Sequence, residues 1–359
     1  MKVLAWGAVV DNKKDFWIPI YNTDALAKGS YNGTYEYIGN LNFREYGIDD
    51  KCILKVLETN DHVLLFARAS YDVWIVDKVT NKLTHQKYYD GTKGGIADIV
   101  QCGENAVILP YSTDNSIIIW NMISYDVNVL QYDSIPPINH FAFVRGIECG
   151  GYVFSATRSL NGVYVCRIDV NQKKTLFFET SLRMVNAIDI KEDSIWLFGL
   201  SSDNKTLFLK YKNDMSELIE QHIIRDIEPV LENGNMKYIR MCVYKDKIAL
   251  IPSSPIKIYI YNLKTDDGYY LEYPDDSING IVNKGGMFVE IQRVGCDILL
   301  FPFGFDRIMK LNLEDEIISS IKISFDSDIE RKVNSNIILS SDIISEGYPM
   351  SLNDLINTI

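Results

Sequence analysis

The sequence lacks the features that mark metal sites, disulfide frameworks and membrane spans. Its 359 residues include six cysteines, but no two of them form a CxxC pair or another closely spaced metal-binding pattern. The longest apolar runs, such as 298–301, have the length of a strand, whereas a transmembrane helix needs about 18 apolar residues. We therefore expect no metal, no dense disulfide framework and no membrane span.

Positive charge is also in short supply. The chain has 36 Lys and Arg against 48 Asp and Glu, which gives a formal net charge of −12. Proteins that bind nucleic acid neutralise phosphates with Lys and Arg, so this balance argues against a nucleic-acid partner. An acidic surface favours solubility and basic partners.

The N-terminal residues do not have the pattern of a secretory signal peptide. The apolar stretch 3–10 runs directly into Asp11-Asn12-Lys13-Lys14 and has no small-residue cleavage site. We interpret this stretch as the first strand. Together with the unpaired cysteines, it predicts a cytoplasmic location.

Catalytic signatures are scarce. The sequence has no GxSxG elbow, P-loop, HExxH or dinucleotide-binding glycine pattern, so we expect no cofactor. Adjacent carboxylates occur in turn-like contexts, where local hydrogen bonding favours acidic residues. The four histidines differ in their position within the repeat described below, and their spacing predicts no metal cluster. The histidines are His62, His85, His140 and His222, and the acidic pairs are 49–50, 266–267 and 275–276.

What the chain does contain is a repeat of three apolar residues followed by a proline or a small residue. This fourth position falls at Pro19, Ala67, Pro110, Ser155, Gly199, Pro252 and Pro302. The copies are 43 to 53 residues apart, a period in the range of propeller blades and longer than ankyrin or leucine-rich repeats.

Each repeat predicts four antiparallel strands joined by hairpins. A strand and a tight turn precede the apolar triplet, as in 184–190 and 191–193. An alternating strand that ends in Asn or Asp follows it, as in 258–262, and then a more polar outer strand. Because proline cannot donate a ladder hydrogen bond, the fourth position should lie where the strand ends or bulges. The sequence therefore predicts an all-β, seven-bladed β-propeller over 1–325.

The repeat resembles the kelch-like and WD-repeat-like β-propeller superfamily, including uncharacterised bacterial propeller proteins. Trp120-Asn121 and the segment from Trp74 to Asp77 are similar to the WD dipeptide, although no Gly-His pair accompanies them. The double glycines 94–95 and 285–286 are similar to those of kelch blades, but only two of the seven copies carry them at a matching position. The resemblance implies the propeller fold and no firm activity.

The pattern changes after residue 325. Residues 337–339 are a candidate closing strand, and 351–359 predict a short amphipathic helix with Ser351 as its N-cap. The apolar face of this helix packs on the propeller or docks into a partner's groove. We expect 326–359 to be a C-terminal extension.

Two sets of residues are candidates for binding. Basic residues at or near the predicted innermost strands could converge on a small anionic ligand, although their offsets to the fourth position differ. They are Arg44, Arg145, Arg183, Arg240 and Arg293, with Lys93 in a sixth blade. Polar and aromatic residues in the turns that follow the apolar triplets could contact a partner. They are Tyr21, Tyr71, Asn115, Arg158, Phe303 and Phe305.

We expect a binding or scaffold propeller without catalytic activity that recognises a protein or peptide on one face. The alternative is a propeller enzyme, lyase-like or carbohydrate-related, or a small-molecule binder that uses the central funnel for an anionic ligand. Antibiotic-inactivating lyases are a precedent for such an enzyme in architecture, and fold alone does not transfer function.

Overall fold

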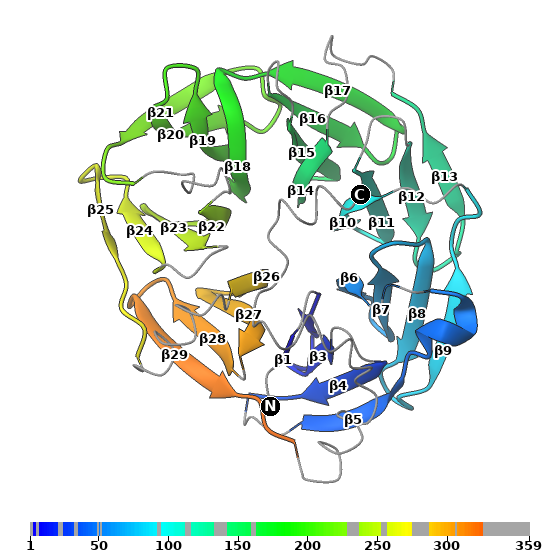
Figure 1. Cartoon of the computed structure of the whole chain (residues 1–359). Coiled ribbons are helices and arrows are strands. Elements are labelled where there is room, and N and C mark those ends of the chain that lie inside the picture. The colour runs from blue at the N-terminus through cyan, green and yellow to red at the C-terminus, as the bar shows by residue number, and fades with distance from the viewer. Residues whose placement is uncertain are drawn as a thin grey trace. The chain divides into compact units, whose positions relative to one another are not determined.

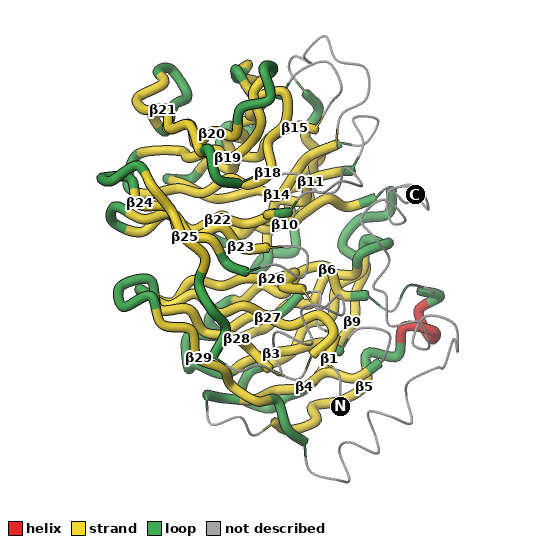
Figure 2. Tube along the Cα trace, turned by 60° about the vertical axis from the view of Figure 1, so that its left-hand side comes forward, coloured by secondary structure: helices red, strands yellow, loops and turns green. Residues whose placement is uncertain are grey.

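The computed structural model describes residues 3–4, 7–20, 24–31, 35–48, 50, 52–91, 95–111, 116–132, 142–158, 163–227, 237–252, 257–274, 287–305 and 307–325. Within these residues the chain is almost entirely strand, and its one helix is the short 3-10 helix η1 (Phe43–Tyr46), drawn in red in Figure 2. The predicted closing strand and helix of the extension, within 326–359, lie outside the described residues.

The strands form seven antiparallel sheets, which we call blades 1 to 7 (Figure 1). Consecutive strands of the chain are neighbours in each blade, as expected for hairpin connections. We call the first strand of a blade its inner strand and the fourth its outer strand. The prediction of a seven-bladed β-propeller with four-stranded antiparallel blades is confirmed.

One compact unit, formed by 1–93, 252–257 and 271–359, contains blades 7, 1 and 2. Blade 1 consists of β2 (Val9–Val10), β3 (Phe16–Pro19), β4 (Ala25–Gly29) and β5 (Tyr35–Asn40). Blade 2 consists of β6 (Ile53–Glu58), β7 (His62–Ala67), β8 (Asp72–Asp77) and β9 (Leu83–Lys87). Blade 7 consists of β26 (Met287–Val294), β27 (Asp297–Phe305), β28 (Arg307–Asn312) and β29 (Ile317–Lys322), and β1 (Val3–Leu4) joins it.

The other compact unit, formed by 94–251 and 258–270, contains blades 3 to 6. Blade 3 consists of β10 (Ile96–Cys102), β11 (Asn105–Pro110), β12 (Ile117–Asn121) and β13 (Val127–Leu130). Blade 4 consists of β14 (Ala142–Cys149), β15 (Tyr152–Arg158), β16 (Tyr164–Asp169) and β17 (Lys174–Glu179). Blade 5 consists of β18 (Leu182–Lys191), β19 (Ser194–Ser201), β20 (Thr206–Lys212) and β21 (Leu218–Ile224). Blade 6 consists of β22 (Tyr238–Tyr244), β23 (Lys247–Pro252), β24 (Tyr259–Asn262) and β25 (Asp267–Tyr270).

The N-terminal stretch 3–10, predicted as one strand, is two short strands in different blades. β2 pairs with β3 in blade 1, whereas β1 pairs with β27, so that Val3 lies opposite Phe305 and Leu4 opposite Phe303. The start of the chain therefore contributes a strand to the last blade. A strand of two residues is too short to show periodicity, which is why the sequence did not reveal the division.

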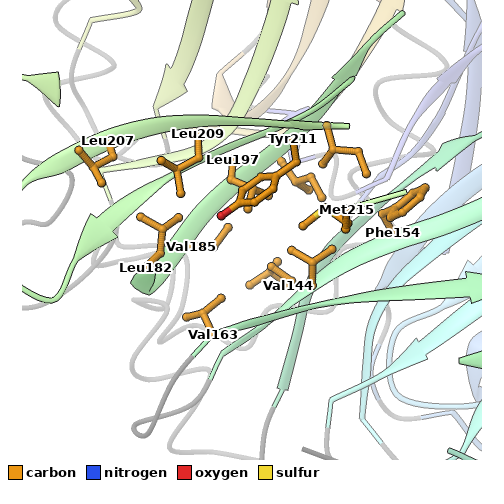
Figure 3. Packing of buried hydrophobic residues seen from close by; sticks show 14 residues of the cluster. Val144, Phe154, Val163, Leu182, Val185, Leu197, Leu207, Leu209, Tyr211 and Met215 are labelled. Carbon is orange, nitrogen blue, oxygen red and sulfur yellow. The ribbon is translucent and has the colours of Figure 1, made fainter. Parts of the chain in front are cut away.

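The apolar triplets lie in the second strand of every blade, and all their residues except Tyr152 are buried. In β7, the residues from Val63 to Phe66 are at most 1% exposed. Core clusters combine side chains of consecutive blades. One joins blades 1 and 2 around Trp17 and Trp74, and another joins blades 4 and 5 around Phe154 and Leu197 (Figure 3). Contact between blades therefore supplies the burial that a single four-stranded sheet lacks.

In five blades the fourth position of the repeat lies beside a bulge of the inner strand. The register shifts between Ile96 and Asp98 opposite Pro110, and between Phe288 and Glu290 opposite Pro302. A bulge leaves one residue outside the ladder, so a residue that cannot donate a hydrogen bond is tolerated beside it. Three of the four prolines also end their strands. The predicted end or bulge at this position is confirmed.

Where glycine replaces the proline, at Gly199, the inner strand lies very close to the second strand. A Cβ atom on Gly199 would lie 2.0 Å from the carbonyl oxygen of Met184 in the inner strand. By contrast, a Cβ atom on Gly39 in β5 would meet nothing within 4 Å. The backbone contact thus requires glycine at position 199 and not at position 39.

We predict that Gly199→Ala destabilises the protein by about 1–3 kcal/mol, because the inner strand must shift to admit the methyl group. Gly39→Ala serves as the matched control and should leave the free energy of unfolding nearly unchanged. Urea denaturation measures both variants. Equal effects of the two substitutions would show that the close approach at Gly199 is not energetically important.

Candidate functional site

The predicted arginines lie in different environments. Arg145 and Arg183 lie on the inner strands β14 and β18, and Arg293 lies on β26. Arg183 and Arg293 are exposed, and Arg293 Nε donates to the carbonyl oxygen of Gly295 in its own hairpin at 3.3 Å. Arg240, on β22, is 8% exposed and donates to the carbonyl oxygen of Ile239 at 3.2 Å. Convergence of these side chains on one ligand stays a prediction.

One of the arginine assignments is wrong. Arg44 lies in η1, in the connection between blades 1 and 2, and is exposed. The local sequence from Asn42 to Gly47 forms a turn of 3-10 helix with left-handed residues at both ends, so it cannot belong to an inner strand. Lys93 lies outside the described residues.

A stricter register identifies a different set of inner-strand residues. In four blades, the residue twelve positions before the fourth position of the repeat is charged. These residues are Lys55, Asp98, Arg240 and Glu290. Three of them, Lys55, Asp98 and Glu290, immediately follow the bulge. A search restricted to basic residues missed the acidic members, although a common offset was the signal that could have found them.

Lys55 and Glu290 form an ion pair between the inner strands of blades 2 and 7. Lys55 Nζ lies 3.2 Å from both carboxylate oxygens of Glu290, whose side chain is 5% exposed. Because both groups are largely removed from water, each charge offsets the desolvation of the other. The segment that leads into β2 passes close to β6, since a Cβ atom on Gly7 would lie 3.0 Å from the Leu54 carbonyl oxygen.

Carboxylates also join neighbouring inner strands to each other. The Asp98 carboxylate, on β10, accepts a hydrogen bond from the backbone N–H of Gly146 on β14 at 3.0 Å. In blade 5, the Asp189 carboxylate accepts from the backbone N–H of Val243 on β22 at 2.6 Å. Both acids are buried. Such charge-assisted bonds hold adjacent blades in a fixed register.

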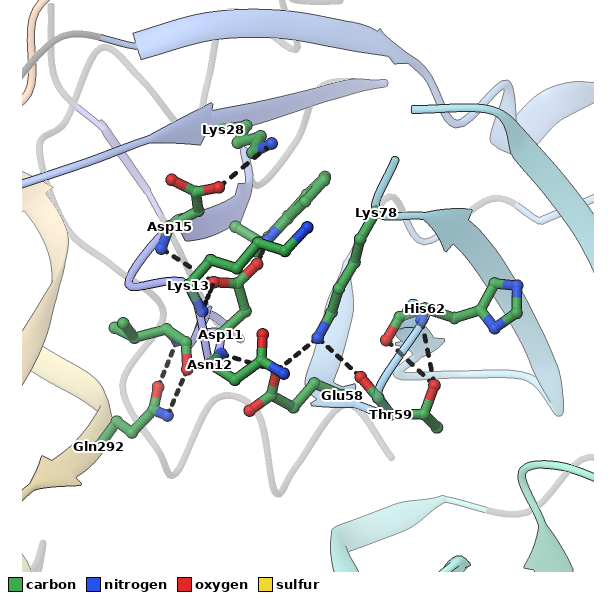
Figure 4. A network of polar contacts seen from close by, with 12 residues as sticks. Asp11, Asn12, Lys13, Asp15, Lys28, Glu58, Thr59, His62, Lys78 and Gln292 are labelled. Carbon is green, nitrogen blue, oxygen red and sulfur yellow. Dashed lines mark hydrogen bonds and ion pairs between the residues drawn. The ribbon is translucent and has the colours of Figure 1, made fainter. Parts of the chain in front are cut away.

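Blades 7, 1 and 2 are joined in a similar way (Figure 4). The Gln292 amide, on β26, accepts from the Val10 backbone N–H and donates to the Val10 carbonyl oxygen at 2.8 Å. The Glu58 carboxylate accepts from the backbone N–H of Asn12 at 3.2 Å and from Lys78 Nζ at 2.7 Å. These polar side chains of the inner strands thus form contacts between blades.

The predicted partner residues that the structure describes are buried or lie in strands. Tyr71 is 5% exposed and packs edge-on against Tyr89, with ring centroids 5.0 Å apart, so it is not a loop-tip contact. Phe303 and Phe305 lie in β27 opposite β1, and Arg158 ends β15 opposite Ala142. These three residues are therefore strand residues. Tyr21 and Asn115 lie outside the described residues.

Exposed apolar side chains gather on the outer strands. Nine of the thirteen large hydrophobic residues that are exposed in the described part of the chain lie there. They are Val127, Val129, Leu176, Leu218, Ile219, Ile223, Tyr269, Tyr270 and Ile317, each at least 38% exposed. We call these residues the outer-strand apolar set. They lie on the outer strands of five blades and are candidates for contact with a partner.

A polar cluster joins the outer strand of blade 5 to blade 6. His222 Nδ1 lies 3.0 Å from the Asp266 carboxylate, in the turn between β24 and β25, and Nε2 lies 3.5 Å from Glu220. The His222 ring stacks on Trp196. Asp266, a member of one predicted acidic pair, is thus part of a turn that contacts the next blade.

The carboxylates of this cluster are stabilised in their charged form. Hydrogen bonds from Tyr261 and His222 hold the pKa of the Asp266 carboxyl below its usual value. The ion pair with Lys210, at 2.5 Å, and the hydrogen bond from His222 lower the pKa of Glu220. Each depressed pKa adds stability at neutral pH that is lost as the pH falls through the folded-state pKa.

The other reactive residue types have structural roles. All six cysteines are free, and burial raises the pKa of the Cys102 thiol to about 11, which keeps it protonated and weakly nucleophilic. His85 Nε2 lies 2.9 Å from the Asp72 carboxylate, and its ring stacks on Tyr46. His140 lies outside the described residues. No group of metal-ligating side chains occurs among the residues with described positions, and no helix there is long and apolar enough to cross a membrane.

Comparisons with known proteins support the fold. No protein-family model matches the chain, and no curated protein matches it. The solved virginiamycin B lyase of Staphylococcus aureus, a catalytically inactive variant with quinupristin, is 11% identical with a TM-score of 0.64, over 86% of this chain and 94% of that one. The extracellular domain of a protein assigned as a hybrid two-component system of B. thetaiotaomicron is 12% identical with a TM-score of 0.56.

That match covers 89% of this chain and 38% of the other, and a second such domain is matched over 40% of its length. This chain therefore spans about two fifths of those chains. PorZ, a surface component of the type-IX secretion system of Porphyromonas gingivalis, is 12% identical with a TM-score of 0.51, over 76% of this chain and 33% of that one. At such identities the likeness shows the propeller fold alone.

The predicted cytoplasmic location is contradicted. Two of these structural neighbours are extracellular domains, and PorZ is a bacterial surface component. The prediction relied on the missing signal-peptide pattern of residues 3–10 and on unpaired cysteines, which are a weak indicator for a chain of this size. A large apolar core does not need disulfides in any compartment.

We predict that Asp98→Ala destabilises the protein by about 1–3 kcal/mol, because it leaves the partly buried backbone N–H of Gly146 without this acceptor. Asp98→Asn retains an oxygen at the same place and should cost less. Urea denaturation at neutral pH compares the two. If both variants lose the same stability, the charge of Asp98 rather than its acceptor oxygen holds the blades.

We predict that Asp266→Asn reduces the loss of stability below about pH 4.5, since it removes a carboxyl whose folded-state pKa is depressed. The urea midpoint measured from neutral pH to pH 3 should fall less steeply than in the unsubstituted protein. Asp267→Asn is the control, because the Asp267 carboxylate accepts from Thr265 instead. Parallel curves for Asp266→Asn and the unsubstituted protein would contradict the prediction.

Proposed function

We propose that this protein is a binding or scaffold propeller that recognises a protein partner through its outer strands. The observation that carries the proposal is the outer-strand apolar set. These side chains lie on edge strands of rigid sheets, where a partner gains contact area without reordering the scaffold. The surface thus differs from the loop tips that the sequence indicated.

The chemistry of the partner follows from the surface. Its contact region should present apolar side chains to the outer strands, and basic residues at its margin would complement the net charge of −12. The same charge argues against nucleic acid as the partner. Membership of the kelch-like or WD-repeat-like superfamily is part of this proposal and rests on the repeat alone.

The alternative, an enzyme or a binder of a small anion at the inner strands, has less support. Asp98, Asp189 and Glu290 bring negative charge to the inner strands. Of the four arginines that do lie there, Arg240 is buried, and its guanidinium donates to the carbonyl oxygen of Ile239. An anion would thus meet buried carboxylates as well as arginines.

We predict that the triple variant Val129→Ser, Leu176→Ser, Tyr269→Ser binds its partner about tenfold or more weakly, because exposed apolar anchors carry much of the binding energy at interfaces. The partner is first recovered by affinity capture and mass spectrometry, and its affinity for each variant is then measured by calorimetry. Serine adds no charge, so a difference in affinity between the variant and the unsubstituted protein reports the loss of apolar contact and not an electrostatic effect.

The control is the variant Arg183→Ala, Arg293→Ala, which alters exposed side chains of inner strands. It should bind the partner as the unsubstituted protein does. If this control loses binding and the triple variant keeps it, the outer strands are not the binding surface. Binding of anions by the unsubstituted protein that the control abolishes would favour the alternative.

A further inference from the structure

The outer strand β21 is the longest of the described outer strands. It spans seven residues, Leu218–Ile224, while the others span four to six. Its sheet ends there, so the backbone N–H and C=O groups of alternate residues point away from β20. Lysine and proline, which commonly protect such edges, are absent from this strand.

The sequence of β21 is complementary to itself in antiparallel orientation. It reads Leu-Ile-Glu-Gln-His-Ile-Ile, with Gln221 at its centre. If a second copy of the strand pairs with it about Gln221, Ile219 lies opposite Ile223 and Glu220 lies opposite His222. Every apolar residue then meets an apolar residue, and the carboxylate meets the imidazole. A two-fold axis requires this kind of self-matching surface.

The exposure of the side chains fits this pairing. Ile219 and Ile223 are 41% and 40% exposed, and Gln221 is exposed between them. The register with β20 places Ile223 opposite Leu207 and Gln221 opposite Leu209, so these two residues share one face of the sheet. If the two edges pair, the isoleucines of one copy would contact those of the other across the strands. Their exposed surface would then be buried from solvent.

A bulge limits the length of the contact. Lys210 pairs with Glu220 and Tyr211 pairs with Leu218, which leaves Ile219 without an opposing residue on β20. A bulge increases the local twist of an edge strand, so Ile219 is the last residue that can take part, and the contact is confined to residues 219–223. The contact is therefore short and involves five residues of each copy.

We propose that β21 pairs with β21 of a second copy of this chain, in antiparallel orientation about a two-fold axis at Gln221. The inference rests on the proposed function, since it names one occupant for part of the outer-strand apolar set. Glu220 contacts Lys210 and lies near His222 within its own blade, and the second copy brings a further His222 imidazole to the same carboxylate.

The dimer should be weak and should depend on salt. Stable interfaces bury about 1,200 Å² or more, and a five-residue edge contact buries less. Each copy carries a net charge of −12, so the copies repel each other at low ionic strength. Added salt screens this repulsion and should therefore strengthen the association, in contrast to a dimer held mainly by ion pairs.

Sedimentation velocity of the full chain over a range of concentrations, at about 50 mM and about 300 mM salt, tests the association. We expect a concentration-dependent dimer that is stronger at the higher salt concentration. The variant Ile219→Lys, Ile223→Lys should sediment as a monomer, because it buries four lysines against each other in the dimer. The matched control Val127→Lys, Val129→Lys, on the outer strand β13, should dimerise like the unsubstituted protein.

Cysteine cross-linking tests the register. Gln221→Cys places two thiols directly opposite each other on the axis, at a separation that a disulfide spans, and should form a covalent dimer on mild oxidation. Ile223→Cys places each thiol opposite an isoleucine and should cross-link much more slowly. The unsubstituted protein, with its six native cysteines, gives the background rate.

A chain that stays monomeric under all these conditions overturns the proposal, and so does a dimer that the β13 variant disrupts and the β21 variant does not. Equal cross-linking of the Gln221→Cys and Ile223→Cys variants overturns the register. None of these results affects the proposed function if another protein still binds to the outer strands. Loss of all partner binding with an intact β21 dimer would instead overturn only the broader proposal.

Discussion

The structure depends on the burial of one blade against the next. A four-stranded sheet whose second strand is apolar on both faces cannot be stable alone, because water would cover one face or the other. In β7 and β23 every residue of the triplet is buried, so these strands read as continuous apolar runs and not as alternating ones. The triplets are apolar because they pack against the neighbouring blades. The hydrophobic core therefore lies between the sheets.

The inner strands add a second constraint on how consecutive blades join. The bulge beside the fourth position displaces one residue from the ladder, and in blades 2, 3 and 7 the next residue is charged. Lys55 and Glu290 use that position to bind each other, and Asp98 uses it to bind the backbone of the next inner strand. The same local geometry thus directs a charged side chain toward the inner strand of another blade. Apolar packing alone is less specific, because it tolerates small shifts in register.

The repeat made the blades and the fourth position predictable, because both follow from burial and from the missing N–H of proline. The candidate site was less predictable for physical reasons that differ from residue to residue. Arg44 looked like an inner-strand residue, but left-handed residues on both sides turn the chain into η1. Tyr71 looked like a loop residue, but neighbouring tyrosines cover it. Phe303 and Phe305 are paired by a strand of two residues from the other end of the chain, which no periodicity could indicate.

The outer strands are the strands whose amino-acid composition the fold constrains least. The second strand of a blade must be apolar and the inner strand must place its polar groups against a neighbour, whereas an outer strand has a neighbour along only one edge. Exposed isoleucines there are only partly covered by the fold, since Ile219 and Ile223 remain about two fifths exposed while Ile224, at the end of the same strand, is buried. Lysine or glutamate at those two positions would suit an edge strand better in an isolated propeller. The apolar residues of β21 are therefore best explained by a contact that the isolated chain does not make.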